Sequence, residues 1–134
     1  MTAIHRFTGS TEATVLLASS GATAVLLFAA PTLPFSQPRN VIGGHVVAAI
    51  AGTAAHAALG DFVLTPALSV GIALVGMQAT STLHPPAGGT ALIAAMAGHT
   101  PFFVVPVFIG AVAQVGCACV FNNIIPGRRY PQHW

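Results

Sequence analysis

The stretch LHPPAGGTAL at residues 83–92 sets an ionisable side chain beside two helix breakers and two glycines. Pro86 suits the first position of a new helix, because a proline there lacks only an N–H that would be unpaired anyway. The next four residues then have N–H groups without an intrahelical partner. They are Ala87, Gly88, Gly89 and Thr90. A helix N-terminus carries about half a positive charge and glycine permits close approach, so these donors predict a small-anion site. A capped turn at the interface, satisfied by water and by the His84 carbonyl region, is the alternative.

His84 and Pro85 complete the predicted site together with Pro86. Imidazole titrates near neutral pH, so His84 can hold an anion when protonated or pass a proton. The alternative is a histidine that only points to water.

Two further pairs of polar residues are candidates for the path of the same anion. His45 and His56 are eleven residues apart, about 20° from each other on a helical wheel, so they lie on one stripe of a helix. A pathway role and simple hydrogen-bonded packing both fit this stripe. Arg39 and Asn40 follow Pro38, and Arg39 is either an anchor at the membrane surface or a collector of anions.

Composition places these residues in a membrane. Only 4% of the residues are charged and 54% are hydrophobic, whereas an ordinary soluble domain has about 25% charged residues. No Asp, Glu, Lys or Arg occurs between Asp61 and Arg128. We therefore predict an integral membrane protein in contact with the lipid bilayer.

Breakers and charges divide the chain into apolar segments. An all-α membrane helix bundle with about four transmembrane helices follows, because each long segment approaches the roughly 20 residues that cross a bilayer. The spans are expected at 13–30, 41–60, 63–83 and 102–121. Residues 87–98 are too few to cross and predict a half-membrane helix, with the prolines ending the preceding span near Leu83. We expect one domain over residues 1–134.

The arginines give a weak indication of topology. Arg6, Arg128 and Arg129 lie on the tails, against Arg39 in a loop, so the positive-inside rule places both termini in the cytoplasm. We expect a multi-pass protein of a bacterial inner (plasma) membrane. A signal peptide at the N-terminus is a less favoured alternative, because Glu12 abuts its short apolar core.

A shift of 67 residues aligns GATAVLLFAA at 21–30 with GGTALIAAMA at 88–97. Membrane transporters are often built from repeats whose broken helices meet at a binding site. An internal repeat therefore predicts that a second element joins the anion site, with three candidate residues: Ser20, Gly21 and Thr23. Small apolar residues also match by chance, and both explanations stay open.

Other functional classes have little support. The six histidines are scattered without a carboxylate among them, so we expect no metal site and no cofactor. Two acidic residues and no catalytic triad or phosphate loop make an enzyme unexpected. A net charge of +2 without a basic patch excludes a nucleic-acid partner.

Two stretches of this sequence resemble the signatures of the HPP family of integral membrane proteins. They are GATAVLLFAAPTLPFSQPRNVIGGH at 21–45 and TLHPPAGGTALIAA at 82–95, which contains the His-Pro-Pro of the family name. The resemblance implies a small helical membrane protein with a transport role, and it ties members to nitrite transport. Members usually carry another apolar helix upstream, which residues 1–12 are too polar and too few to form.

The sequence thus favours a transporter or channel for a small monovalent anion, with nitrite as the best candidate. A non-transporting membrane subunit, whose His-Pro-Pro turn and glycines serve assembly, is the alternative. We also expect a homo-oligomer, because Gly44, Ala48 and Gly52 form a row of small residues that permits close helix packing.

Overall fold

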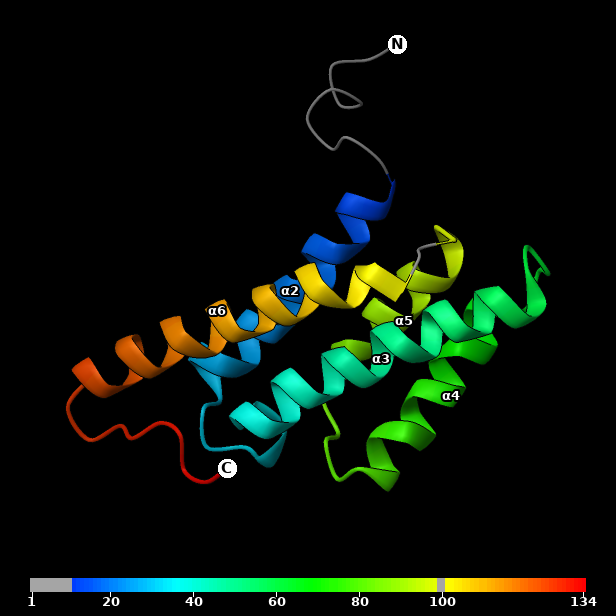
Figure 1. Ribbon diagram of the computed structural model, residues 1–134. Helices are drawn as coiled ribbons and strands as arrows, with labels where there is room; N and C mark the ends of the chain where they lie inside the picture. The colour runs from blue at the N-terminus through cyan, green and yellow to red at the C-terminus, as the bar shows by residue number, and fades with distance from the viewer. Residues whose placement is uncertain (1–10, 99–100) are drawn as a thin grey trace, which may run out of the picture.

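The computed structural model describes the backbone of residues 11–98 and 101–134, and the side chains from residue 18 onward within those ranges. The described part is helical and contains no strand (Figure 1). Five α-helices and two short 3-10 helices follow one another as α2 (Thr11–Ala29), η1 (Pro34–Ser36), α3 (Pro38–Leu59), α4 (Thr65–Ala79), α5 (Ala87–Met96), η2 (Pro101–Phe103) and α6 (Val104–Ile124). The all-helical prediction is confirmed. The signal-peptide and upstream-helix expectations begin with residues 1–10, which lie outside the described part.

Two helices are long and apolar enough to cross a membrane within the described residues. They are Pro38–Leu59 and the continuous η2–α6 helix Pro101–Ile124. The other apolar helices are shorter, with 15 residues in α4 and 10 in α5. Four full crossings therefore remain a prediction, whereas the expected short helix after the prolines is present as α5.

The end of α4 corrects one expectation. The helix stops at Ala79, before the prolines, and not near Leu83. Ser81 adopts a left-handed φ of 55°, and the Thr82 N–H bonds back to the Met77 carbonyl at 2.8 Å. This Schellman-like cap ends the helix, so the prolines are left to shape the turn into α5.

Helix α3 occupies the centre of the bundle. It packs against α4, α5 and α6, and in Figure 1 it lies between α4 and α6. Glycines permit the close approach: a Cβ at Gly52 would meet the Ala91 carbonyl oxygen and come within 2.6 Å of Ala94 Cβ. At Gly44 it would lie 2.7 Å from His84 Cβ.

The row of small residues on α3 therefore serves packing inside one chain. Gly44, Ala48 and Gly52 are all buried against α4, α5 and the segment before α5. The expectation that this row joins neighbouring subunits is wrong, because no free surface is left there. Homo-oligomerisation stays a prediction without that support.

The C-terminal segment folds back onto the start of α3 (Figure 1). The Tyr130 hydroxyl donates to the Ser36 carbonyl at 2.8 Å, and the Gln132 N–H donates to Gln37 Oε1 at 2.8 Å. Tyr130 is buried with Leu27, Val41 and three residues of α6. This segment ties the ends of α2 and α6 together beside the loop that carries Phe35.

Candidate functional site

Three buried side chains from separate parts of the chain meet at the centre of the bundle. Thr23 Oγ1 on α2 lies 3.0 Å from His45 Nε2 on α3 and 2.9 Å from His84 Nε2 in the segment before α5. The exposed fractions of Thr23 and His84 are both 0%, and that of His45 is 5%. Buried polar groups are costly unless they are hydrogen-bonded, so this contact fixes how α2, α3 and α5 pack.

The network continues on the other side of His45. Its Nδ1 atom lies 2.8 Å from Thr90 Oγ1 on α5, and Thr90 Oγ1 lies 3.2 Å from Ser19 Oγ on α2. The Ser19 hydroxyl donates to the Pro86 carbonyl at 2.8 Å. Both nitrogens of the His45 ring are therefore held, each by a threonine of a different helix.

His84 is held equally firmly. Its Nδ1 atom donates to the Phe35 carbonyl at 2.8 Å, which links the segment before α5 to η1. The Asn40 amide donates to the Leu83 carbonyl at 2.9 Å and secures the same segment. His84 is wholly buried, so the alternative of a histidine pointing to water is wrong.

The start of α5 differs from the sequence-based expectation. The N–H groups of Ala87, Gly88 and Gly89 bond to the carbonyls of His84, Pro85 and Pro86 at 3.0, 3.1 and 3.0 Å. Pro86 adopts helical angles, φ −58° and ψ −25°, so the helical turn begins before Ala87 and supplies these acceptors. The expectation of bare N–H donors at these three residues is wrong, and the helix start alone does not make the site.

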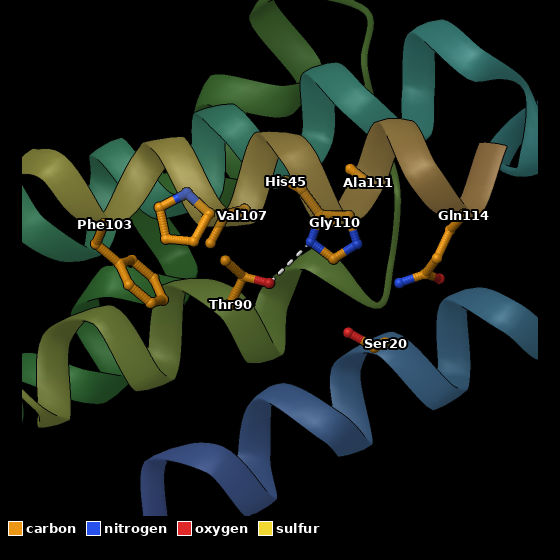
Figure 2. A pocket seen from close by; sticks show the side chains of 9 residues that line it. Ser20, His45, Thr90, Phe103, Val107, Gly110, Ala111 and Gln114 are labelled. Carbon is orange, nitrogen blue, oxygen red and sulfur yellow. Dashed lines mark hydrogen bonds between the residues drawn. The ribbon is translucent and has the colours of Figure 1, made fainter. Parts of the chain in front are cut away.

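A cavity of about 160 Å³ adjoins the network. Figure 2 shows Ser20, His45, Thr90 and Gln114 around it, from α2, α3, α5 and α6 respectively. The remaining lining is apolar and comes from η2 and α6: Phe103, Pro106, Val107, Gly110 and Ala111. Gln114 Oε1 is buried and has no hydrogen-bond partner within the described residues. The cavity thus offers polar groups from four helices in an apolar setting, as small-molecule sites usually do.

Most of the predicted site residues come together here. Thr23, His45, His84 and Thr90 form the network, Ser20 lines the cavity, and Pro86 accepts from Ser19. Four others border the network through the turn that starts α5: Pro85, Ala87, Gly88 and Gly89. Gly21 is exposed on α2.

Three predicted polar residues lie elsewhere. Arg39 is exposed and donates to the Thr80 carbonyl at 3.1 Å, so it does not line the cavity. Asn40 acts on the backbone of the His84 segment, as described above. His56 lies further along α3, where Nδ1 contacts the Ala95 carbonyl at 2.9 Å, so it is not part of the network.

Sequence reasoning missed Ser19 and gave Gln114 no role at the site. Ser19 stands four residues before Thr23 and therefore faces the same side of α2, which was a usable signal. Gln114 is a polar residue inside an apolar helix, and such residues are usually functional or paired.

The cavity lining contains no Lys, Arg, Asp or Glu. Among the side chains of the network only the two imidazoles can take up a proton and become cationic. No group of three or more His, Cys, Asp or Glu side chains suited to a metal ion occurs in the described residues. The electrostatics of the site therefore depend on the imidazoles, the hydroxyls and the Gln114 amide.

Comparisons with known proteins agree with the prediction of an integral membrane protein. Residues 1–131 match the family described as HPP, transmembrane region. Two transmembrane proteins of Dictyostelium discoideum are similar: one is 38% identical over 97% of this chain, and the other 39% identical over 90%. The chain spans 45% of the length of each relative. No solved structure matches. These relatives lend no support to the prediction of a bacterial inner membrane.

Proposed function

This chain belongs to the HPP transmembrane family, and from that premise we propose that it transports or conducts a small monovalent anion across the membrane. Nitrite is the candidate substrate that the family resemblance suggests. The family match supports a membrane protein, whereas transport itself and the transported species are our proposal.

One observation carries the proposal: a cavity with polar groups from four helices lies inside an otherwise apolar bundle. Ionisable and polar groups at membrane depth are expensive to bury and usually mark substrate or ion pathways. A volume of about 160 Å³ is sufficient for an ion of a few atoms but small for an organic metabolite. The Ser20 hydroxyl and the Gln114 amide line the cavity outside the network and can donate to an oxyanion there.

The alternative of an assembly subunit relied on the α3 glycines as a contact between subunits. These glycines pack against other helices of the same chain, so they do not support that alternative. The full length of the relatives still exceeds that of this chain, so the pathway we propose concerns this transmembrane part alone.

Uptake of nitrite into liposomes that contain the purified chain tests the proposal. We expect initial uptake well above that of empty liposomes, and a loss of at least about tenfold in Thr90→Val, which removes the hydroxyl beside His45 while keeping the side-chain shape. Thr53→Val is the matched control: Thr53 is buried on α3 but bonds only to carbonyls of its own helix, at Ala49 and Ile50. Uptake by the native, folded chain no faster than that of empty liposomes would end the transport proposal.

A further inference from the structure

The buried network forms one continuous chain of hydrogen bonds with an acceptor at each end. Five side chains link two backbone carbonyls through six contacts of 2.8 to 3.2 Å. In order, the chain is Phe35 carbonyl, His84, Thr23, His45, Thr90, Ser19 and Pro86 carbonyl. Each hydroxyl and each neutral imidazole supplies a single hydrogen. With both histidines neutral, five hydrogens serve six contacts.

When the Thr23 hydroxyl donates to His84 and not to the Ser19 carbonyl, the two carbonyl ends determine where those five hydrogens lie. His84 must carry its hydrogen on Nδ1 to donate to Phe35, so His84 Nε2 accepts from the Thr23 hydroxyl. His45 then donates through Nε2 to Thr23, and its Nδ1 accepts from Thr90. Since Ser19 donates to Pro86, the contact between Ser19 and Thr90 is left without a hydrogen. It is the longest of the six, at 3.2 Å.

One additional proton fills every contact. When His45 becomes imidazolium, it donates from both nitrogens, and Thr90 turns its hydrogen to Ser19. The charge can also reach His84 in one concerted step. The N–H bond at His45 Nε2 breaks as an O–H bond forms at Thr23, while the original Thr23 O–H bond breaks as an N–H bond forms at His84 Nε2. Atoms and charge balance, and all six contacts stay filled. The Ser19 carbonyl, 3.0 Å from Thr23 Oγ1, competes for the same Thr23 hydrogen.

The adjoining cavity needs that proton if it holds an anion. Its lining has no cationic side chain other than a protonated His45, and an unpaired charge in a low-dielectric site is strongly disfavoured. From α2 the network is faced by Ser19 and Thr23, from α5 by Thr90, and from α6 by the neutral Gln114 across the cavity. The exposed Arg39 at the start of α3 bonds to Thr80 instead.

We propose that the chain takes up one proton for each monovalent anion that enters the cavity, and that His45 and His84 share this proton through the Thr23 hydroxyl. This proposal rests on the anion function proposed above and adds its coupling ion. Anion entry is then electroneutral at the site, and the positive charge can withdraw from the cavity to His84 when the anion leaves.

Proton uptake by the full chain in lipid nanodiscs provides the first test. Nitrite is added at pH 6.5 in weak buffer with an indicator dye, and empty nanodiscs correct for the buffering of nitrite itself. We expect about one proton per bound nitrite. In His45→Gln we expect that uptake to be lost and nitrite binding to weaken at least about tenfold. His56→Gln changes another α3 histidine outside the network, and it should keep both properties.

Nitrogen-15 spectra of labelled histidines provide the second test, which needs no anion. In the neutral form we expect hydrogen on Nδ1 of His84 and on Nε2 of His45. On acidification the two rings should share one proton and move together, whereas in Thr23→Val the charge should be confined to one ring.

The outcomes separate the two proposals. Nitrite that binds with no proton uptake overturns the coupling and leaves the anion function standing. If nitrite does not bind, the anion function fails and the spectra decide the rest: the stated tautomers with one shared proton support the proton chain. Other tautomers, or two protons bound independently, overturn it.

Discussion

Replacing Gly44 by alanine tests whether the close packing of α3 holds His84 in place. The new Cβ would lie 2.7 Å from His84 Cβ and 2.8 Å from the Thr82 carbonyl oxygen. Carbon atoms in contact are normally about 3.5–4.0 Å apart, so the segment 82–84 must move by roughly 1 Å. Because one of the obstacles is a backbone atom, rotation of a side chain cannot relieve the overlap.

The cost follows from two opposing effects. Overpacking of a filled interior costs about 1–3 kcal/mol, whereas alanine in place of glycine favours a helix by about 1 kcal/mol. We expect a net destabilisation of up to about 2 kcal/mol. The site is more sensitive than the fold, because a displacement of about 1 Å stretches the 2.9 Å contact between His84 Nε2 and Thr23 beyond hydrogen-bond range.

Reversible unfolding in mixed micelles measures the stability, and the nitrogen-15 shifts of His84 measure the contact. The matched control is Gly71→Ala on α4, where no atom lies within 4 Å of the added Cβ. That control should equal the native protein or exceed its stability by up to about 1 kcal/mol. The reasoning is refuted if Gly44→Ala is as stable as Gly71→Ala and leaves the His84 shifts unchanged.

Two further predictions concern the borders of the site. Tyr130→Phe removes the hydrogen bond to the Ser36 carbonyl and should cost about 1 kcal/mol in thermal unfolding. Burial raises the pKa of the Tyr130 hydroxyl above its unfolded value of about 10. The stabilising contribution of this hydroxyl should therefore be present below a pH of about 10 and be lost as the pH rises further. The Tyr130→Phe variant should lack this pH dependence. Gly89→Ala should reduce nitrite uptake more than Gly88→Ala, because its Cβ would lie 3.2 Å from Ser19 Cβ, whereas at Gly88 the nearest atom is 3.7 Å away; equal effects on uptake would contradict this assignment.

The sequence predicts the helices well because their signals are local. Apolar runs, charges and prolines define α2, α3, α5 and α6 to within a few residues. The end of α4 is missed because a residue other than glycine, Ser81, takes the left-handed position of the cap. The bare N–H groups are mispredicted for a related reason: helical angles at Pro86 extend the turn backwards, so the local carbonyls become acceptors.

The site could be predicted only in part, because its contacts are distant in sequence. Thr23 lies 22 residues from His45 and 61 from His84, and no spacing rule joins residues of three separate segments. His45 was placed on a stripe with His56, yet the packing of α5 separates them: Thr90 contacts one and the Ala95 carbonyl the other. Helix periodicity gives the face of a residue, and only the packing of helices gives its neighbours.

The possible internal repeat corresponds to contacts in this packing. A shift of 67 residues aligns Thr23 with Thr90 and Ser19 with Pro86. In the structure, the two threonines bind opposite nitrogens of the His45 ring, and Ser19 bonds to Pro86 itself. Helices of two repeats that meet at a buried polar site are the arrangement by which repeated transporter halves form a binding centre. Duplication thus remains our interpretation. It explains why His45 alone is sufficient to connect both halves, because the aligned hydroxyls approach its ring from opposite sides. A proton gained at one ring nitrogen therefore changes the hydrogen bond at the other.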